Sequence, residues 1–219
     1  MAIYKTLFQE GIYEHVINKS RFIGHAKPID SKLDGEAYIA DIKGKYKDAT
    51  HNVPIMVLGD QMQIQWASED GEPQGTAGTP VLQMLVMEEL TNLVVVVTRY
   101  FGGTKLGTGG LVRAYTGTAK KAIEAAGIGE VVPMVNLRIV FEYHLLDKLK
   151  HLTSSLKFGE DSISFELKDL IYGEQIEGTL VYKEEFEENI VSALANLTGD
   201  SHTVLARVIT LAKIKISTP

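Results

Sequence analysis

A glycine-rich segment at residues 98–113, TRYFGGTKLGTGGLVR, carries the clearest chemical signal in the sequence. It contains five glycines, two arginines and one lysine, and no acidic residue. Glycine lets a ligand approach backbone N–H groups closely, and a helix N-terminus adds unsatisfied N–H donors and a partial positive charge. Such a segment suits phosphate or another anion. Its candidate binding residues are Arg99, Tyr100, Gly102, Gly103, Lys105, Gly107, Thr108, Gly109, Gly110 and Arg113.

Another glycine-rich loop, DGEPQGTAGTP at residues 70–80, also leads into an expected helix. Its candidates for phosphate or nucleic-acid binding are Gly75, Thr76 and Gly78. In chain order, residues 70–80 are the first loop and the segment at residues 98–113 is the second loop. We expect the two loops to form one anion-binding surface, on which Tyr100 and Phe101 could stack against bases, with packing beside the strand at residues 93–97 as the alternative for both rings. The alternative is that the glycines only permit tight turns and close packing of helices on strands.

The standard nucleotide-binding motifs do not fit the glycine-rich segment at residues 98–113. A Walker A loop requires GxxxxGK[ST], and Gly102 and Gly107 have this spacing, but Thr108 stands where the lysine should be. A dinucleotide-binding GxGxxG also fails, because Val112 occupies the third glycine position after Gly107 and Gly109. The sequence therefore predicts a general anion-binding surface and not a standard nucleotide site.

Three residues near the loops could perform acid–base chemistry. Asp70 and Glu72 are paired carboxylates, which can serve as general acid and base or bind magnesium, and His51 could join them. The alternative is that the carboxylates belong to a solvated turn with an Asx-type hydrogen bond, and that His51 is structural. The histidines show no HxxxH or HExxH spacing and GxSxG is absent. We expect no resident metal and no cofactor.

Composition and charge limit the possible partners. The 219-residue chain contains no cysteine, which excludes disulfides, thiol catalysis and cysteine-ligated metals. Its net charge of −6 argues against nucleic-acid binding through bulk charge, so RNA contact would need a local basic patch. The longest aliphatic run, at residues 93–97, is far shorter than the roughly 20 residues of a membrane span. We expect a soluble, cytoplasmic protein without membrane contact.

The hydrophobic pattern predicts an α+β protein with two domains, at residues 1–131 and 132–219. In the first domain, residues 93–97 are continuously apolar, as is typical of a central strand buried on both faces. In the second domain, alternating strands and helical stripes follow the order βαββαβ, which indicates a ferredoxin-like domain.

Several helix ends are marked in the sequence. Ser31 begins a capping box, and Thr79 is the expected N-cap of a helix that has proline at its first position and runs to about Leu90. Gly127 and Gly199 are placed to end two further helices.

Four segments resemble the signature of the IMPACT/YigZ family, and they are KSRFI at 19–23, DATHN at 48–52, SEDGEPQGTAGTP at 68–80 and VVVTRYFGGTKLGTGGLVRAY at 95–115. The last two are long and highly specific, and the C-terminal half resembles the small domain appended in bacterial members. The resemblance implies an N-terminal α+β sandwich like that of a small-subunit ribosomal protein, domain IV of elongation factor G and GHMP small-molecule kinases. It also implies a ferredoxin-like C-terminal domain similar to the last domain of elongation factor G.

The resemblance further implies a role in translation. Eukaryotic relatives regulate translation by binding an activator of a stress-response kinase, and we do not expect that partner here because this chain lacks their accessory domain. For bacterial relatives, RNA or ribosome binding is inferred from the fold. LGTGGL lacks the serines that line the phosphate loop of a GHMP kinase, which argues against the kinase interpretation.

Three hypotheses follow for the function. The leading one is a translation-associated regulatory protein that binds RNA, the ribosome or another phosphate-bearing partner through the two loops. The second is an enzyme that acts on a phosphorylated small molecule or nucleotide. The third is a protein-interaction module whose acidic C-terminal domain binds a protein partner, although the acids of KEEFEEN at 183–189 also suit a helix start. The sequence favours binding over catalysis and leaves the oligomeric state open.

Overall fold

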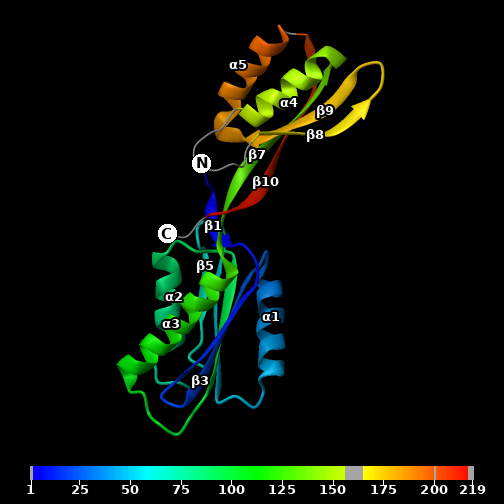
Figure 1. The fold of residues 1–219 in the computed structure, drawn as a ribbon. Helices are drawn as coiled ribbons and strands as arrows, with labels where there is room; N and C mark the ends of the chain where they lie inside the picture. Colours follow the sequence, from blue (N-terminus) through cyan, green and yellow to red (C-terminus); the bar gives the residue numbers. More distant parts are fainter. Residues whose placement is uncertain (1, 156–164, 200, 217–219) are drawn as a thin grey trace. The chain divides into compact units, whose positions relative to one another are not determined.

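The computed structural model describes residues 2–155, 165–199 and 201–216. Helices and antiparallel sheets occur together over this part of the chain, as Figure 1 shows. The structure therefore confirms the predicted α+β class.

Two compact units divide the chain. The N-terminal unit contains residues 3–131 and the chain from Lys213 onward, and the C-terminal unit contains Ala2 and residues 132–212. The placement of a domain boundary after residue 131 stays a prediction, because compactness does not show that each unit folds independently.

The N-terminal unit has a sheet with helices on both faces (Figure 1). α1 (Lys32–Lys45) covers one face, and α2 (Gly78–Met87) and α3 (Thr108–Ala126) cover the other. The five antiparallel strands lie in the order β2 (Gly11–Ile17), β3 (Ser20–Pro28), β6 (Leu93–Tyr100), β4 (His51–Leu58) and β5 (Ile64–Ala67). The short β1 (Tyr4–Leu7) pairs with residues Ile128–Val131 at the end of this unit.

β6 lies at the centre of this sheet and is buried from Leu93 to Arg99. Val95 and Val97 face the core beneath α2 and α3, whereas Val94 and Val96 face the core beneath α1. The predicted central strand is therefore confirmed, and its continuous apolar run reflects the helices on both of its faces.

The C-terminal unit has one sheet in the order β10-β7-β9-β8, with two helices on one face (Figure 1). Its elements are α4 (Leu146–Ser155), β8 (Phe165–Tyr172), β9 (Ile176–Lys183) and α5 (Glu187–Thr198), together with most of β7 (Ile128–Phe141) and β10 (His202–Lys215). The first four residues of β7 and the last three of β10 belong to the N-terminal unit. Short 3₁₀ turns at Tyr143–Leu145 and Glu184–Phe186 precede the two helices. This order is the predicted βαββαβ.

Most of the predicted helix ends are confirmed. The Ser31 side chain accepts a hydrogen bond from the Asp34 amide and caps α1. Gly127 and Gly199 follow α3 and α5 with φ values of 71° and 54°, a region that glycine adopts without steric cost.

The predicted start and end of α2 are wrong. The helix begins at Gly78 and ends at Met87, and Thr79 lies inside its first turn. The cap comes from another part of the chain, because the Glu69 carboxylate accepts the amides of Ala77 at 2.8 Å, and of Gly78 and Thr79 at 3.1 Å each. The Thr79 hydroxyl donates to the same carboxylate at 2.6 Å. At the other end, Glu89 has a φ of 57° and cannot continue the helix to Leu90.

The Glu69 cap should contribute to stability in a pH-dependent way. Burial alone raises the pKa of the Glu69 carboxyl, but the hydrogen bonds from Thr79, Ala77 and Gly78 outweigh it and leave the pKa below its ordinary value. A lowered pKa means that this stabilisation is present above the unfolded-state pKa of about 4.3 and is lost as the pH falls through the folded-state value.

We expect Glu69→Ala to lower the free energy of unfolding by about 2 kcal/mol at pH 7, as measured by urea denaturation. Its stability should also vary less with pH below about 4.5 than that of the wild type. Glu36→Ala, which removes an exposed carboxylate paired with Lys32, is the control and should cost less than about 0.5 kcal/mol. Equal losses from the two substitutions would contradict the capping role.

His25 on β3 is a second pH-sensitive group. Its side chain is fully buried, stacks near Tyr46 at a ring-centroid distance of 5.1 Å, and has no hydrogen-bond partner for either ring nitrogen within the described residues. Burial, with a smaller contribution from the charge of Lys45, lowers the pKa of His25 to about 4. The imidazole is therefore held neutral in the folded protein.

Because its folded-state pKa is lowered, His25 should cost stability as the pH falls. From about pH 6.5 downward the unfolded chain binds a proton that the folded protein does not, so up to about 3 kcal/mol is lost by pH 4. We expect His25→Leu to remove this loss in urea denaturation series between these pH values. His144→Leu, at an exposed position, should keep the wild-type slope; a wild-type slope in His25→Leu would refute the assignment.

Candidate anion-binding site

A pocket of about 360 Å³ joins the two predicted loops in the N-terminal unit. The loop between β5 and α2 contributes Glu72 and Pro73, and the loop between β6 and α3 contributes the segment from Lys105 to Thr108. We call it the Arg99 pocket, and its lining consists of Glu72, Pro73, Arg99, Phe101, Lys105, Leu106, Gly107, Thr108 and Leu111. Two of the charged side chains in this lining are cations and one is a carboxylate.

The N-terminus of α3 opens into the Arg99 pocket. Gly107 is the N-cap, with a φ of 70°, and no side chain caps this helix. The amides of Thr108, Gly109 and Gly110 lie in the first turn, where no carbonyl of the helix can accept them. These amides and the helix dipole form the kind of anion site that the sequence predicts.

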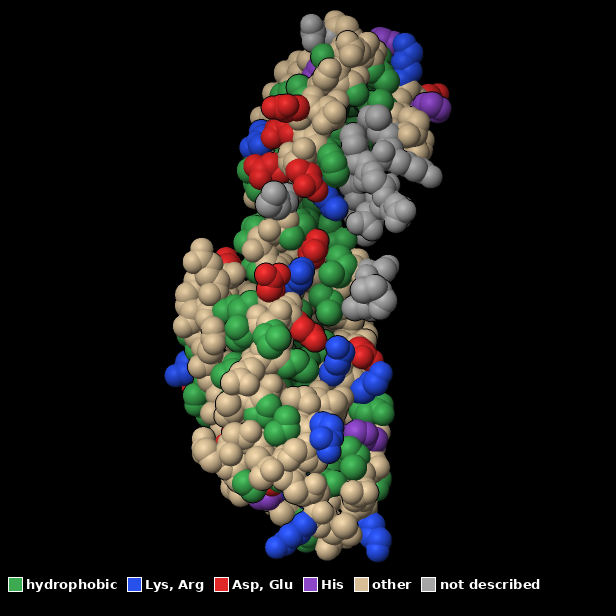
Figure 2. All heavy atoms as spheres, turned by 90° about the vertical axis from the view of Figure 1, so that its left-hand side faces the viewer, with side chains coloured by type: hydrophobic (Ala, Val, Ile, Leu, Met, Phe, Trp, Pro, Cys, Tyr) green, Lys and Arg blue, Asp and Glu red, His purple; other side chains and the backbone are tan. Residues whose placement is uncertain are grey.

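Lysine and arginine side chains are visible on this unit as separate charges and not as one continuous patch (Figure 2). Arg113 lies one turn into α3. Its Nη1 is 3.6 Å from the point that a Cβ atom would occupy if Gly109 had a side chain. Arg113 therefore lies beside the free amides, although it does not line the pocket itself.

The glycines of the second loop serve different purposes. At Gly103 and Gly107 a Cβ would meet no atom, but φ values of 82° and 70° favour glycine. At Gly102 a Cβ would collide with the Lys19 carbonyl, and the Gly102 amide donates to the Ser20 hydroxyl at 3.2 Å. Close packing therefore explains Gly102, and backbone conformation explains the other two.

The first loop differs from the second because its amides already have an anionic partner. The Gly75 amide donates to Glu69 at 3.2 Å, as do the first amides of α2. The Thr76 hydroxyl is buried and donates to the Pro73 carbonyl at 2.7 Å. A Cβ at Gly78 would collide with the Ser68 carbonyl. Anion binding by Gly75, Thr76 and Gly78 stays a prediction, and it would require the displacement of Glu69.

A buried ion pair forms the floor of the Arg99 pocket. Arg99 and Glu72 are 5% and 8% exposed, and an Arg99 Nη1 donor lies 2.6 Å from Glu72 Oε1. The Tyr115 hydroxyl of α3 donates to the same oxygen at 2.6 Å. Burial and this hydrogen bond raise the pKa of Tyr115, so its hydroxyl remains a donor. The carboxylate is thus held by β6 and α3 together.

The Arg99 guanidinium is only partly satisfied by Glu72, although the nitrogen left without a partner in the described part of the chain is buried. Its Nη2 is 3.4 Å from the Ser20 hydroxyl, and its Nε has no hydrogen-bond partner within the described residues. Its charge also lies 5.4 Å from the ring centroids of Phe22 and Phe101. Phe101 is 47% exposed and lines the pocket, so its ring is open to a ligand.

The three candidate acid–base residues lie close together. His51 Nε2 is 3.7 Å from Glu72 Oε1, and its Nδ1 is 2.7 Å from the Asp70 carbonyl oxygen. Because a carbonyl only accepts, Nδ1 carries a proton and Nε2 faces the carboxylate. The Asp70 carboxylate accepts Lys43 Nζ and the Asn52 amide at 2.7 Å each. Both carboxylates are therefore engaged within the protein, and a catalytic role for them stays a prediction.

Tyr100 lies away from the Arg99 pocket. Its hydroxyl donates to Asp48 at 3.0 Å, and Arg21 lies over its ring at 5.4 Å. Successive residues of a strand point to opposite faces, so Arg99 and Tyr100 cannot face the same site. The neighbouring Phe101 is the aromatic residue of the pocket.

Sequence reasoning missed Glu69, Tyr115 and Ser20. Each acts through a hydrogen bond across the fold, to α2, to Glu72 and to the Gly102 amide respectively. The spacing of these residues along the chain gives no signal for such contacts.

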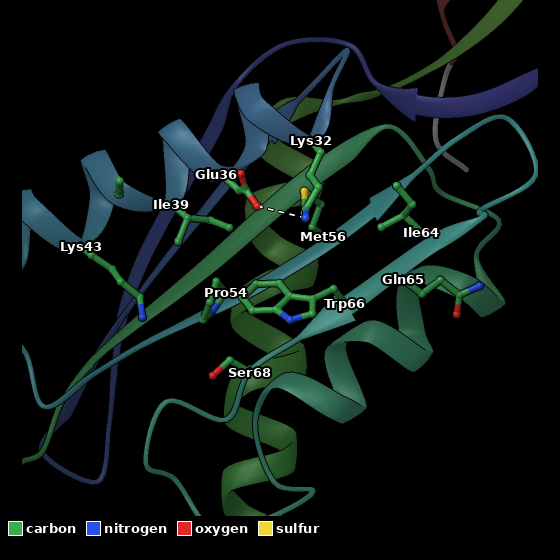
Figure 3. Close-up of a pocket in the computed structure, with 11 residues that line it drawn as sticks. Lys32, Glu36, Ile39, Lys43, Pro54, Met56, Ile64, Gln65, Trp66 and Ser68 are labelled. Atoms are coloured by element: carbon green, nitrogen blue, oxygen red, sulfur yellow. Dashed lines mark ion pairs between the residues drawn. The ribbon is translucent and has the colours of Figure 1, made fainter.

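A larger hollow of about 660 Å³ lies between α1 and β5 (Figure 3). Trp66 lies beside Pro54 and Met56 on its floor, and the Lys32 and Lys43 side chains reach over it. Both lysines are already paired, Lys32 with Glu36 and Lys43 with Asp70. None of the predicted site residues lines this hollow.

Neither a cluster that could hold a metal ion nor a helix that could span a membrane occurs in the part of the chain that the structure describes. No group of three or more His, Asp or Glu side chains is arranged to hold a metal ion there. No helix in it is both long enough and apolar enough to cross a membrane.

Comparison with known proteins identifies the family. Residues 18–123 match the model of the Impact N-terminal domain. The chain is 38% identical over 189 residues to the IMPACT family member YvyE of Bacillus subtilis, covering 86% of this chain and 83% of that protein. The chain belongs to the IMPACT family.

Two other similarities cover much of the chain. It is 36% identical over 138 residues to the IMPACT family member YigZ of Escherichia coli, which is 62% of this chain and 68% of that one. A crystal structure of a hypothetical protein aligns with a TM-score of 0.56 and 26% identity, covering 99% of this chain and 98% of its own. The residues that match the Impact N-terminal domain include both loops and the whole Arg99 pocket.

The effects of substituting Arg99 and Glu72, the buried ion pair of this IMPACT family member, on the free energy of unfolding should be strongly coupled. Removing one partner leaves the other buried without a counter-charge, so we expect Arg99→Met and Glu72→Met each to lower the free energy of unfolding by about 3–5 kcal/mol. The double variant should lose clearly less than the sum of the two. Urea denaturation measures all three. Glu14→Gln, at the exposed pair with Arg21, is the control and should change stability little; strictly additive losses would contradict the coupling.

Proposed function

We propose that this IMPACT family member is a translation-associated regulatory protein that binds a phosphate-bearing partner, RNA in particular, at the Arg99 pocket. One observation carries the proposal. The free amides of the α3 N-terminus, the Lys105 side chain and the buried Arg99 converge on one pocket, beside an exposed Phe101 ring. Phosphate groups and bases are the ligands that such a combination recognises.

Attraction of a phosphate to this protein must come from local positive charge at the pocket, and not from the net charge of the chain. The chain carries a net charge of −6, so any attraction must be local. Arg99 lines the pocket and is held in place by Glu72, although its unpartnered Nε is itself buried, whereas Lys105 lines the pocket with no ion pair among the described residues. A phosphate at the Thr108–Gly110 amides would gain charge-assisted hydrogen bonds with little rearrangement of the backbone.

The translational part of the proposal rests on the family. The IMPACT family resemblance implies a role in translation, and the match to family members over most of the chain supports applying it here. The RNA part rests on the chemistry of the pocket.

A second candidate is an enzyme that acts on a phosphorylated small molecule. The observation in its favour is the contact of His51 with Glu72 at 3.7 Å, because Glu72 also lines the Arg99 pocket. A phosphate ester at the α3 N-terminus would then lie near a histidine and a carboxylate, the usual partners in acid–base catalysis.

The proposal predicts RNA binding that weakens steeply with salt. We expect single-stranded RNA to bind the full chain, with the logarithm of the affinity falling linearly with the logarithm of the salt concentration. Lys105→Gln should weaken binding and reduce this slope by about 0.7 for the phosphate contact that it removes. Fluorescence anisotropy between low and physiological salt measures both quantities.

Lys121→Gln is the matched control, because Lys121 lies on the same helix far from the pocket and is paired with Glu124. Its slope should equal that of the wild type. No RNA binding at low salt, or equal slopes for the two variants, would refute the proposal. Stabilisation by a nucleotide or sugar phosphate in a thermal-shift screen, without RNA binding, would favour the enzyme.

A further inference from the structure

β10 forms one edge of the sheet in the C-terminal unit. The sheet order β10-β7-β9-β8 gives β10 a single strand neighbour among the described residues, and Figure 1 shows it alongside β7. The backbone N–H and C=O groups on its outer side therefore have no ladder partner there. Such an edge is a template for pairing with another strand.

The residues of β10 are apolar on both faces of the sheet. Val204 and Val208 lie on one face, and Leu205, Ile209 and Leu211 lie on the other. All five side chains are between 44% and 58% exposed. A half-buried strand at a sheet edge normally alternates between apolar and polar residues, so this strand exposes more apolar surface than its own sheet can cover.

β10 has few of the charged residues and prolines that protect natural edge strands. Between residues 203 and 212 the one charged side chain is Arg207, and it is bound to Glu187 of α5 in its own chain, with Nε 2.6 Å from Oε1. No proline occurs in this segment. Charges, prolines and bulges are the usual means of blocking edge pairing.

The opposite edge of the same sheet has these devices. β8 carries Lys168 and Asp169, and its register with β9 shifts between Lys168 and Ile171. Asp169 has a φ of 54°, which breaks the regular strand. One edge of this sheet is therefore blocked and the other is left open.

We propose that β10 pairs with β10 of a second copy of the chain, antiparallel about a two-fold axis. The occupant must be a strand that is largely apolar on both faces, and β10 itself meets this requirement, since its one charged side chain between residues 203 and 212, Arg207, is already paired with Glu187. With the axis at Val208, Leu205 of each copy lies opposite Leu211 of the other. The two Arg207 side chains then do not lie directly opposite each other, which avoids like-charge repulsion.

The length of the paired segment sets the expected strength. With the axis at Val208, the nine residues 204–212 give about 30 Å of paired edge. This is a small interface compared with those of permanent dimers, so we expect a reversible equilibrium with a dissociation constant on the order of micromolar.

The first test is sedimentation velocity of the full chain over a concentration series from about 1 to 100 μM. The wild type should change from monomer to dimer over this range, and Val208→Lys should weaken dimerisation at least tenfold. Val191→Lys is the matched control, since Val191 is 46% exposed on α5 of the same unit. A wild type that stays monomeric throughout, or a Val208→Lys variant that dimerises like the wild type, would overturn the proposal.

The second test uses the absence of cysteine from the natural chain. At the proposed axis the two Val208 Cβ atoms would be about 4.5–5.5 Å apart, near the range that a disulfide can bridge. Val208→Cys should therefore give a disulfide-linked dimer under mild oxidation, whereas Val191→Cys should remain mostly monomeric. Equal cross-linking of the two variants would show random collision and would contradict the proposed pairing.

Discussion

The charge of Arg99 is the constraint on which the N-terminal site depends. Its guanidinium is buried at the end of the central strand, and a buried charge without a partner costs several kcal/mol. Glu72 provides the partner, and in doing so it fixes the loop between β5 and α2 against β6. Tyr115 binds the same oxygen and brings α3 to it. The position of the α3 N-terminus, and with it the Arg99 pocket, follows from this one contact.

The two glycine-rich loops show how similar composition can serve different ends. Both lead into a helix, and the first amides of each helix have no acceptor within the helix itself. At α2 an internal carboxylate, Glu69, occupies those amides. At α3 no side chain does so, and the amides face a pocket. Glu69 thus serves as an internal model for the anion that the second loop is proposed to bind.

Much of the fold could be predicted because its signals are local. The apolar run of β6, the Ser31 cap and Gly199 each depend on residues within a few positions of one another. The site could be predicted in part, since Arg99 and Lys105 belong to the glycine-rich segment itself. Glu69 and Tyr115 could not, because their roles depend on hydrogen bonds to residues that are up to 43 positions away. Of the two aromatic candidates, strand alternation places Phe101 and not Tyr100 in the lining of the pocket, and a binding role for Tyr100 stays a prediction.

The path of the chain makes the C-terminal unit an insertion and not an appendage. The chain leaves the N-terminal unit after residue 131 and returns to it at Lys213. There Lys213 Nζ donates to the Leu7 carbonyl, and the Ile216 amide donates to the Ile128 carbonyl. During synthesis on the ribosome, the N-terminal unit therefore waits for its last contacts until nearly the whole chain has emerged. Evolutionary loss of the C-terminal unit by simple truncation would remove these contacts as well, so a shortened relative must close that edge in some other way.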